Sequence, residues 1–393
     1  MKTQVAIVGA GPAGLLLSLL LEREGISSVV LERRSRAAIE ATVRAGVLEQ
    51  GTVDTLDDLG LSARLHREGV VHHGIELRFA GARHRLPLTE LSGGRSITLY
   101  AQHEVIRDLL SARLAQGGPV LFEAAAAAVQ GLETNAPAVT FRQGDREEVL
   151  GCDFVAGCDG NHGVCRGALP PGRHRDLGCV HPFAWLGILA EVPRLSDELI
   201  YALHDRGFAL ASTRSPTLQR LYLQCDPADH PADWSDDRIW SELHARLATA
   251  DGFAFQDGPI VQKDVIGMRS VVVEPMQHGR LFLAGDAAHV VHPTGAKGLN
   301  LAVADVRVLA RALAEWYGRG ASARLDRYSE VCLRRAWNAQ RFSWRMTSLL
   351  HRFPEHDAFH RRLQLAELEE VVRSRAAATA LAENYVGLPF EEG

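Results

Sequence analysis

The sequence of 393 residues predicts an α/β protein: a mostly parallel sheet, interrupted by inserted antiparallel strands and followed by C-terminal helices. Three observations predict this class. The chain opens with a strand, a glycine turn, a helix and a second strand; alternating apolar residues then appear in two separate stretches; and long helical patterns fill the C-terminal part. Strands that alternate with helices are typical of parallel sheets, whereas alternation of apolar residues within a stretch is typical of antiparallel ones.

The opening unit lies at the extreme N-terminus. Residues 4–8 are an apolar run of strand length, residues 12–24 carry a helical pattern, and residues 28–32 form a second strand. This order predicts a βαβ unit, in which one helix packs across two parallel strands.

Two β-rich insertions interrupt the parallel sheet. In the first, Ile75, Leu77 and Phe79 alternate with more polar residues, so these three side chains point to the same face of a strand. The second contains a predicted hairpin, with strands at residues 208–214 and 219–224. The insertions therefore predict an antiparallel sheet that is separate from the parallel one.

The pattern of the parallel sheet returns after each insertion, with a helix at residues 102–113 and buried strands at residues 154–156 and 280–284. We therefore expect a discontinuous α/β domain, an inserted sheet domain that binds substrate, and a C-terminal helical region. Their bounds are residues 1–71, 98–178 and 266–345 for the first, residues 72–97 and 179–265 for the second, and residues 346–393 for the third.

The chain beyond Pro293 is predicted to be helical. Apolar residues recur at helical spacing from Val306 to Tyr317, and Gly318 is well placed to end that helix. From about Tyr328 onward the sequence is again helical and rich in arginine, tryptophan and leucine.

The composition argues against several classes of function. A net charge of -5 and a pI of about 6.4 leave no basic field for nucleic acid. The six cysteines form no CxxC pair, so we expect reduced thiols in the core and neither a disulfide framework nor a metal site. No leader pattern and no apolar stretch of membrane-spanning length is found, so we expect a cytoplasmic protein without membrane association.

The first turn carries a GxGxxG motif between a strand and a helix. Gly9 permits the tight turn, Gly11 lets the backbone approach a pyrophosphate, and Gly14 lets helix and strand pack closely. Ala13 belongs to the same motif, and Glu32 ends the second strand where an acid can bond a ribose hydroxyl. The alternative is a turn that serves packing alone, and the motif by itself does not distinguish NAD from FAD.

Two later segments favour FAD. Asp286 follows a predicted buried strand, where its carboxylate can accept hydrogen bonds from the hydroxyls of a ribityl chain. Gly298 opens a helix whose free N–H groups suit the electron-rich end of an isoalloxazine ring. The alternatives are an exposed loop acid and ordinary turn glycines, in which case the protein would be a flavin-free nicotinamide dehydrogenase.

Four stretches carry a resemblance to a known family: residues 44–51, 269–270, 273–280 and 383–389. With the motifs above, they resemble the flavoprotein aromatic hydroxylases, in particular those that act on 4-hydroxybenzoate. The resemblance implies a Rossmann-like FAD-binding domain of the GR2-type flavoprotein hydroxylase fold. It also implies hydroxylation to 3,4-dihydroxybenzoate through a flavin C4a-hydroperoxide, with O2 as oxidant and NADPH or NADH as electron donor.

The family resemblance implies that Ser212, Arg214 and Tyr222 hold the carboxylate of the aromatic acid. The sequence agrees, because Ser212 and Arg214 share one parity on a predicted strand, as Arg220 and Tyr222 do on the next. A planar guanidinium suits bidentate contact with a carboxylate. The alternative is a solvated face of a hairpin.

The same resemblance implies a proton relay from the substrate phenol through Tyr201 and Tyr385 to His72, with the carbonyl of Pro293 at the phenolic oxygen. Chained hydroxyls that end at a histidine can conduct a proton near neutral pH. The alternative for His72 is a structural residue before a strand.

The remaining implied contacts concern the cofactors. Those with FAD are carried, beyond the glycine turn, by Glu32, Arg44, Gln102, Asp159, Arg220, Asp286, Gly298, Leu299 and Asn300. Those with NAD(P)H are carried by Arg33, Arg44, His162 and Arg269. A surface ion pair is the alternative for Arg44 and Arg269, and the preference for NADPH over NADH stays open.

One departure from the family pattern is His292, which places a titratable residue directly before Pro293. Alternatives to the implied activity are hydroxylation of a related phenolic or amino-substituted benzoate, and a catalytically silent flavin-binding protein. The resemblance also implies a homodimer, with the C-terminal helices as the expected contact.

Overall fold

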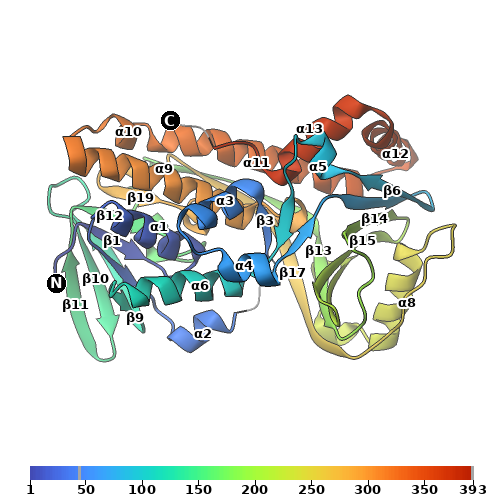
Figure 1. Cartoon of the computed structure of the whole chain (residues 1–393), viewed down its shortest axis with the longest axis horizontal. Helices are drawn as coiled ribbons and strands as arrows, with labels where there is room; N and C mark the ends of the chain where they lie inside the picture. Colours follow the sequence, from blue (N-terminus) through green and yellow to red (C-terminus); the bar gives the residue numbers. More distant parts are fainter. Residues whose placement is uncertain (43–45, 391–393) are drawn as a thin grey trace.

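The computed structural model describes residues 1–42 and 46–390. Figure 1 shows two main sheets side by side, with long helices from the C-terminal half lying along one edge of both. The first sheet has six strands in the order β18-β19-β12-β1-β2-β8. Their bounds are β1 (Val5–Val8), β2 (Ser28–Leu31), β8 (Val120–Leu121), β12 (Phe154–Gly157), β18 (Gln277–His278) and β19 (Leu281–Leu283). All pairings in this sheet are parallel except that of β18 with β19.

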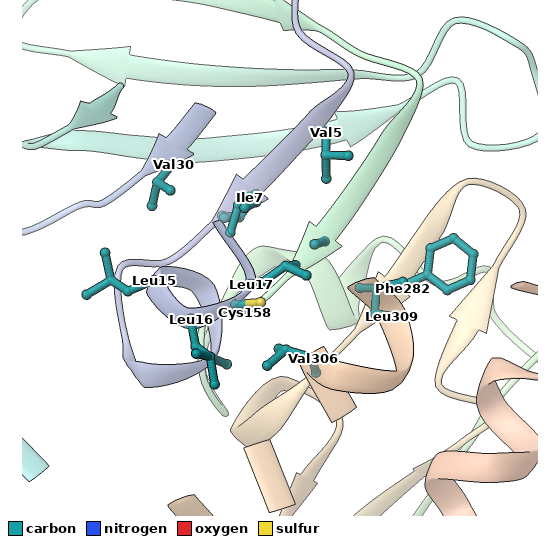
Figure 2. Packing of buried hydrophobic residues seen from close by; sticks show 14 of the residues in the cluster. Val5, Ile7, Leu15, Leu16, Leu17, Val30, Cys158, Phe282, Val306 and Leu309 are labelled. Carbon is teal, nitrogen blue, oxygen red and sulfur yellow. The ribbon is translucent and has the colours of Figure 1, made fainter. Parts of the chain in front are cut away.

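The six-stranded sheet forms because its four inner strands, β19, β12, β1 and β2, are short apolar runs that are buried throughout. Helices α1 (Pro12–Arg23), α6 (Gln102–Ala115) and α9 (Gly298–Arg319) pack around it. Figure 2 shows Ile7 of β1 close to Leu17 of α1, and Val306 of α9 packing into the same core. The predicted βαβ unit is therefore confirmed, and its core positions the glycine turn.

The second sheet has eight strands in the order β20-β17-β13-β16-β15-β14-β5-β6. Their bounds are β5 (Ile75–Phe79), β6 (Ala82–Leu86), β13 (Arg175–Ala190), β14 (Leu199–His204), β15 (Gly207–Ser215), β16 (Leu218–Cys225), β17 (Ile260–Glu274) and β20 (His289–Val290). The pairings are antiparallel except for β14 with β5, where Leu199 lies opposite Ile75. Both predicted insertions therefore contribute to one sheet.

The two faces of the eight-stranded sheet bury different side chains, as the period of a strand requires. Leu77, Tyr201 and Tyr222 lie in one apolar cluster with residues of the C-terminal helices. Ile200 and Leu221 lie in a second cluster on the other face. Helix α8 (Asp236–Leu247), which the sequence pattern did not predict, covers that second face.

The remaining elements are two three-stranded sheets and several short helices. The sheets are β3 (Val47–Glu49) with β7 (Ile97–Leu99) and β4 (Val70–His72), and β11 (Arg146–Gly151) with β10 (Ala138–Gln143) and β9 (Ala124–Gln130). The helices are α2 (Arg36–Glu40), α3 (Gln50–Asp58), α4 (Ala63–Glu68), α5 (Leu88–Leu91), α7 (Val164–Gly167) and α10 (Ala323–Asp326), with η1 (Pro231–Asp233), η2 (Gly285–Ala287) and η3 (Pro293–Gly295). The alanine run that begins at Ala124 is thus a strand, because its partner strand sets its conformation.

The C-terminal part is helical, as predicted, and forms α11 (Tyr328–Leu350), α12 (Ala358–Arg373) and α13 (Arg375–Val386). The predicted stop at Gly318 is wrong. Helix α9 continues to Arg319, and Gly320 ends it with a left-handed φ of 69°. A glycine in this conformation caps a helix at little steric cost, whereas Gly318 keeps helical geometry.

Two further observations concern expectations from composition. Five of the cysteines are buried free thiols, but Cys179 is exposed on β13, so it is not the core thiol that the sequence suggested. Among the described residues, no helix is long and apolar enough to cross a membrane.

Candidate active site

The glycine turn has the geometry of a phosphate cradle. Gly9 has a φ of +105°, and a Cβ atom there would lie 2.4 Å from the carbonyl oxygen of Cys158. A Cβ at Gly14 would lie 2.0 Å from the carbonyl oxygen of Gly9. At Gly11, by contrast, nothing lies within 4 Å of such an atom. The turn is thus closed toward the protein and open on the side where a pyrophosphate would approach the N-terminus of α1.

Glu32 supports this turn from within the protein. One carboxylate oxygen accepts a hydrogen bond of 2.9 Å from the N–H of Ala10, and the other accepts from the N–H of Arg34 at 2.9 Å. Only 5% of Glu32 is exposed. The residue therefore joins the glycine turn to the segment that follows β2, and a contact with a ribose hydroxyl would share its carboxylate with these backbone groups.

The second helix N-terminus belongs to α9. Gly298 and Leu299 lie in its first turn, where backbone N–H groups have no partner within the helix. The side chain of Asn300 accepts hydrogen bonds from the N–H of Glu49 at 2.9 Å and the hydroxyl of Thr52 at 2.7 Å. Its amide also donates to the carbonyl of Val47 at 2.9 Å. Asn300 thus joins α9 to β3, leaving its backbone N–H for a ligand.

A buried ion pair holds the start of α9 in place. Lys297 Nζ lies 2.6 Å from Glu49 Oε1 and donates to the carbonyls of Asn384 at 2.5 Å and Tyr385 at 3.1 Å. Burial lowers the pKa of Lys297, and the nearby Glu49 carboxylate opposes that shift. The pair connects β3, α9 and α13, which are far apart in the sequence.

Replacing Lys297 with methionine is expected to lower the free energy of unfolding by about 3–5 kcal/mol, because Glu49 would keep a buried carboxylate without its main partner. Urea unfolding measures the loss. The matched control is Lys263→Met, since Lys263 pairs with Asp236 at 2.9 Å in a more exposed place. We expect a loss of about 1 kcal/mol or less there. Equal losses for the two variants would contradict the role of the buried pair.

The loop that carries Asp286 is held by residues that the sequence pattern did not indicate. Asp305 Oδ2 accepts from the N–H of Gly285 at 2.9 Å and lies 2.7 Å from His289 Nε2. Burial alone would lower the pKa of His289, but the carboxylate of Asp305 opposes this effect, and the pKa is raised overall. Helix α9 therefore fixes this loop from behind, while Asp286 itself lies partly exposed in η2.

Arg166 connects the two loops that the sequence assigned to flavin. Its guanidinium donates to the carbonyls of Asp286 at 2.9 Å and Ala287 at 3.0 Å, and to the side chain of Asn161 at 3.3 Å. Asp159 accepts from the N–H of Cys165 at 2.9 Å, and burial raises the pKa of its carboxyl. The segment after β12 and the segment after β19 thus form one surface. No sequence pattern indicates Arg166, because two of its partners are backbone carbonyls of a segment about 120 residues away.

Two of the three residues proposed for the carboxylate, Ser212 and Tyr222, share one face of the eight-stranded sheet. Ser212 on β15 lies directly opposite Arg220 on β16, and Leu210 lies opposite Tyr222. A bulge follows Thr213, so Arg214 leaves the regular register. Arg220 lies over the ring of Tyr222, with its guanidinium carbon 5.1 Å from the ring centroid.

Arg214 is surrounded by protein and keeps only part of its surface accessible. Burial lowers the pKa of its guanidinium, and the side chain of Tyr222 beside it opposes this shift. Within the described part of the chain, Arg214 has no ion-pair partner. A buried cation of this kind favours an anionic ligand, because an anion would replace the lost hydration.

The two tyrosines of the expected relay are in contact. The hydroxyl of Tyr201 on β14 lies 2.5 Å from the hydroxyl of Tyr385 on α13, and both rings are buried. Burial raises the pKa of both phenols. Tyr201 lies opposite Leu210 on β15 and therefore faces the same side of the sheet as Ser212 and Tyr222.

His72 lies at the end of β4 and is only 1% exposed. Its Nδ1 accepts a hydrogen bond of 3.2 Å from the N–H of Leu199, and burial lowers its pKa to about 4. Its buried Nε2 has no hydrogen-bond partner among the described residues, and no direct hydrogen bond there joins it to either tyrosine. The structure therefore brings together two of the three relay residues directly.

His292 is a buried residue next to the loop of Pro293. Its Nδ1 lies 2.8 Å from Ser270 Oγ, and its ring centroid lies 4.5 Å from that of His181. Burial lowers the pKa of His292 to about 4. The side chain is thus a neutral structural group that joins this loop to β17, and Pro293 itself is exposed.

Acid is expected to destabilise the fold through His292. Because its folded pKa of about 4 lies below the ordinary value of 6.5, the unfolded chain takes up the proton first, and stability is lost as the pH falls from 6.5 toward 4. When the pH falls from 7 to 5, the free energy of unfolding should therefore decrease by about 2 kcal/mol less in His292→Gln than in the parent. Urea unfolding at both pH values measures this, and replacement of the exposed His66 is the control. Equal losses for parent and His292→Gln would contradict the prediction.

The other predicted cofactor residues are placed as follows. Gln102 begins α6 and is partly buried. Arg33 and His162 are exposed, whereas Arg269 lies on β17 and is partly buried. Arg44 lies outside the described residues. Gln102 stays a predicted contact of FAD, and Arg33, His162 and Arg269 stay predicted contacts of the nicotinamide cofactor.

Comparisons with known proteins agree with this geometry. Residues 2–343 match the family described as FAD binding domain. Over 391 residues, 100% of this chain and 96% of the relative, the sequence is 48% identical to p-hydroxybenzoate hydroxylase from Acinetobacter baylyi. It is 28% identical to a 3-amino-4-hydroxybenzoate 2-monooxygenase from Streptomyces platensis, over 79% of each chain.

A solved structure with a similar fold is p-nitrophenol 4-monooxygenase from Pseudomonas putida. It has a TM-score of 0.82 at 20% sequence identity and covers 99% of each chain. An aromatic hydroxylase from angucycline biosynthesis has a TM-score of 0.76 at 22% identity, and the match covers 100% of this chain and 77% of that one. At these identities the likeness supports the fold, and the chemistry depends on the site residues.

Proposed function

The chain belongs to the flavoprotein aromatic hydroxylase family, and on that premise we propose that it hydroxylates 4-hydroxybenzoate to 3,4-dihydroxybenzoate. It is an FAD-dependent monooxygenase that uses NAD(P)H and O2. The observation that carries the substrate assignment is the buried pair Tyr201–Tyr385, which lies on the sheet face that also bears Ser212 and Tyr222. A hydroxyl pair and an arginine at one site suit a ligand with a phenol at one end and a carboxylate at the other.

We propose that the carboxylate is held by Ser212, Arg214 and Tyr222. Arg214 supplies charge and a planar pair of donors, and the two hydroxyls supply directional hydrogen bonds. Tyr201 then lies on the neighbouring strand, across Leu210, where its hydroxyl can meet a para substituent of the ring. An aromatic acid without a para hydroxyl would leave the hydroxyl of Tyr201 bonded to Tyr385 alone, and the missing second hydrogen bond costs binding free energy.

The proposed work of the tyrosine pair is to take the proton from the substrate phenol, because an ionised phenol is more reactive at its ortho carbon. Tyr201 passes a proton to Tyr385 over 2.5 Å without either phenol becoming fully charged. We propose that His72 then accepts the proton and passes it toward solvent. A water molecule would bridge its Nε2 and the tyrosine hydroxyls. The neutral state of His72 above pH 4 is compatible with that role.

The residues around the glycine turn fit FAD. Gly11, where the backbone is open at the N-terminus of α1, would hold the pyrophosphate, and the N-terminus of α9 would hold the flavin end. When bound, FAD supplies the redox chemistry that activates O2. The protein orients the substrate, ionises it and excludes water from the site.

We propose NADPH as the electron donor. Arg34 and Arg36 bond Glu32 and Glu40, whereas Arg33 has no partner among the described residues and is exposed. A free arginine beside the second strand suits a 2′-phosphate. The ratio of kcat/KM for NADPH and NADH measures the preference, and Arg33→Gln is expected to lower this ratio. Arg44, His162 and Arg269 complete the proposed contact with the dinucleotide.

The test of the function uses purified full-length protein. We expect a yellow protein with bound FAD, oxidation of NADPH that 4-hydroxybenzoate stimulates, and one 3,4-dihydroxybenzoate formed per NADPH oxidised when coupling is complete. Chromatography identifies the product. Protein that takes up no FAD would refute the family chemistry. If an aminohydroxybenzoate stimulated NADPH oxidation more strongly than 4-hydroxybenzoate does, the substrate would instead belong to the class in the name of the Streptomyces relative.

We also propose a cytoplasmic homodimer. Trp337 and Trp344 are seven residues apart on α11 and remain 42% and 48% exposed, and Val180 on β13 is 79% exposed. Large apolar side chains on one surface favour contact with a second copy. Sedimentation at micromolar concentration is expected to give a dimer, and Trp344→Ser is expected to weaken it. A monomeric parent protein would contradict this proposal.

A further inference from the structure

A cavity lined by arginines lies behind the active site, between α9, α10 and α11. Its accessible volume is about 240 Å³. Five arginines line it: Arg307, Arg311, Arg324, Arg327 and Arg335. The apolar part of the wall includes Val308, Val331 and the ring of Phe390. None of these residues belongs to the site proposed for flavin or for the aromatic substrate.

Three of the arginines already have partners. Arg324 pairs with Glu315 at 2.6 Å, and Arg327 approaches Glu330 at 3.5 Å. Arg335 donates to the carbonyl of Leu388 at 2.7 Å. These partners occupy the guanidinium groups that a ligand would otherwise bind. The three residues therefore mainly form the walls and the rim of the cavity.

The two arginines on α9 are different. Arg307 and Arg311 are one helical turn apart, and no described acid lies within ion-pair distance of either guanidinium. Arg307 donates to Thr55 Oγ1 at 2.8 Å, but its buried Nε has no hydrogen-bond partner among the described residues. Asp54 and Asp58 act on Arg307 only at longer range. The cavity therefore holds two guanidinium groups without an acidic partner among the described residues, and one of them, Arg307, has a buried donor that is not satisfied.

The shape of the cavity restricts what can satisfy them. Phe390 lies between two of the arginines, with its ring centroid 4.6 Å from the guanidinium carbon of Arg307 and 4.8 Å from that of Arg335. A cavity of about 150 Å³ is enough to hold benzene, so this one can hold a ring with substituents. Apolar walls favour such a body over a bare inorganic ion, and two arginines favour more than one carboxylate.

From this geometry we propose that the cavity binds a compact organic anion that carries two or more carboxylates on an apolar body. One carboxylate meets the paired donors of Arg307, a second meets Arg311 at the open side, and the body packs against Val308 and Phe390. The site also adjoins the flavin loop, because Asp305 contributes to its lining and holds the N–H of Gly285.

The test is isothermal titration calorimetry with benzene-1,3,5-tricarboxylate as the probe, in low-salt buffer. The protein is the FAD-loaded full chain with saturating 4-hydroxybenzoate, so that the active-site arginine is occupied. We expect one site per chain. The double variant Arg307→Gln/Arg311→Gln is expected to weaken binding at least tenfold. The matched control is Arg319→Gln, an exposed arginine of α9 outside the cavity, which is expected to leave the affinity unchanged.

Control ligands and further variants test which kind of molecule the cavity binds. The uncharged benzene-1,3,5-tricarboxamide is not expected to bind, and inorganic phosphate at equal concentration is not expected to displace the probe. If the double variant fails to fold by circular dichroism, the exposed single variant Arg311→Gln is expected to weaken binding at least threefold. Arg214→Gln protein without 4-hydroxybenzoate keeps the test independent of the proposed activity, since it should still bind the probe.

Three results would overturn the proposal. The first is the absence of binding at 10 mM probe, and the second is equal affinity in the parent and in the α9 variants. The third is binding only to a chain shortened after Phe390, because the cavity of the full-length protein would then not accept the ligand.

Discussion

Replacing Arg214 with glutamine is expected to raise the KM for 4-hydroxybenzoate at least about 100-fold, the largest single effect on substrate binding in this protein. Arg214 is surrounded by protein, and burial lowers the pKa of its guanidinium, so it lacks the hydration that would compete with a ligand. A carboxylate that loses this partner keeps only the hydroxyls of Ser212 and Tyr222 among its proposed partners. The cost of an unpaired buried charge is several times that of an exposed one.

Steady-state kinetics of Arg214→Gln and Arg214→Lys separate charge from shape. Lysine restores the charge without the planar pair of donors, so we expect it to recover only part of the affinity. The control is Arg206→Gln, whose guanidinium is 56% exposed and pairs with Glu242 away from the site. An unchanged KM in Arg214→Gln would refute the assignment of the carboxylate to this strand.

Replacing Tyr201 with phenylalanine is expected to lower the rate of hydroxylation by about 100- to 10,000-fold, the range typical of a general acid–base group. The dissociation constant for 4-hydroxybenzoate should change much less, because its carboxylate contacts remain. The reason is that the hydroxyl of Tyr201 lies 2.5 Å from that of Tyr385, so the variant interrupts the proposed proton path at its first step.

Stopped-flow measurement of product formation, together with a binding titration, tests this expectation. The double variant Tyr201→Phe/Tyr385→Phe should be no slower than Tyr201→Phe alone, since residues of one relay act as a unit. Tyr100→Phe is the control, because its hydroxyl bonds Asp108 at 2.7 Å on another surface. Additive losses in the double variant would show that the two tyrosines act separately.

The fold could be predicted in outline because its signals are local. The turn from Gly9 to Gly14 needs only a strand before it and a helix after it, and both patterns lie within a few residues. The β-rich insertions show the period of two that places Ile75, Leu77 and Phe79 on one face. Helix α8 and the strand at Ala124 were missed, because their conformation depends on the sheet against which each lies.

The cofactor residues were predicted unevenly for a related reason. Motif glycines and the acids that follow strands are visible in the sequence, and the structure places them around the cradle. Arg166 and Asp305 were not visible, although they hold the loops of the site. Each acts through backbone atoms of a distant segment, and a single sequence contains no record of such contacts.

The sequence by itself determined the phosphate-binding turn, the α/β class and, through its resemblance, the chemistry of the family. The tertiary structure decided how Tyr201 of the sheet meets Tyr385 of the last helix, and how Lys297 joins Glu49 to that same helix. It also decided that two arginines of α9 face a cavity without acidic partners within the described chain. Turns and periodicities follow from interactions within a few residues, whereas these contacts join segments up to 248 residues apart and exist only once the core has packed.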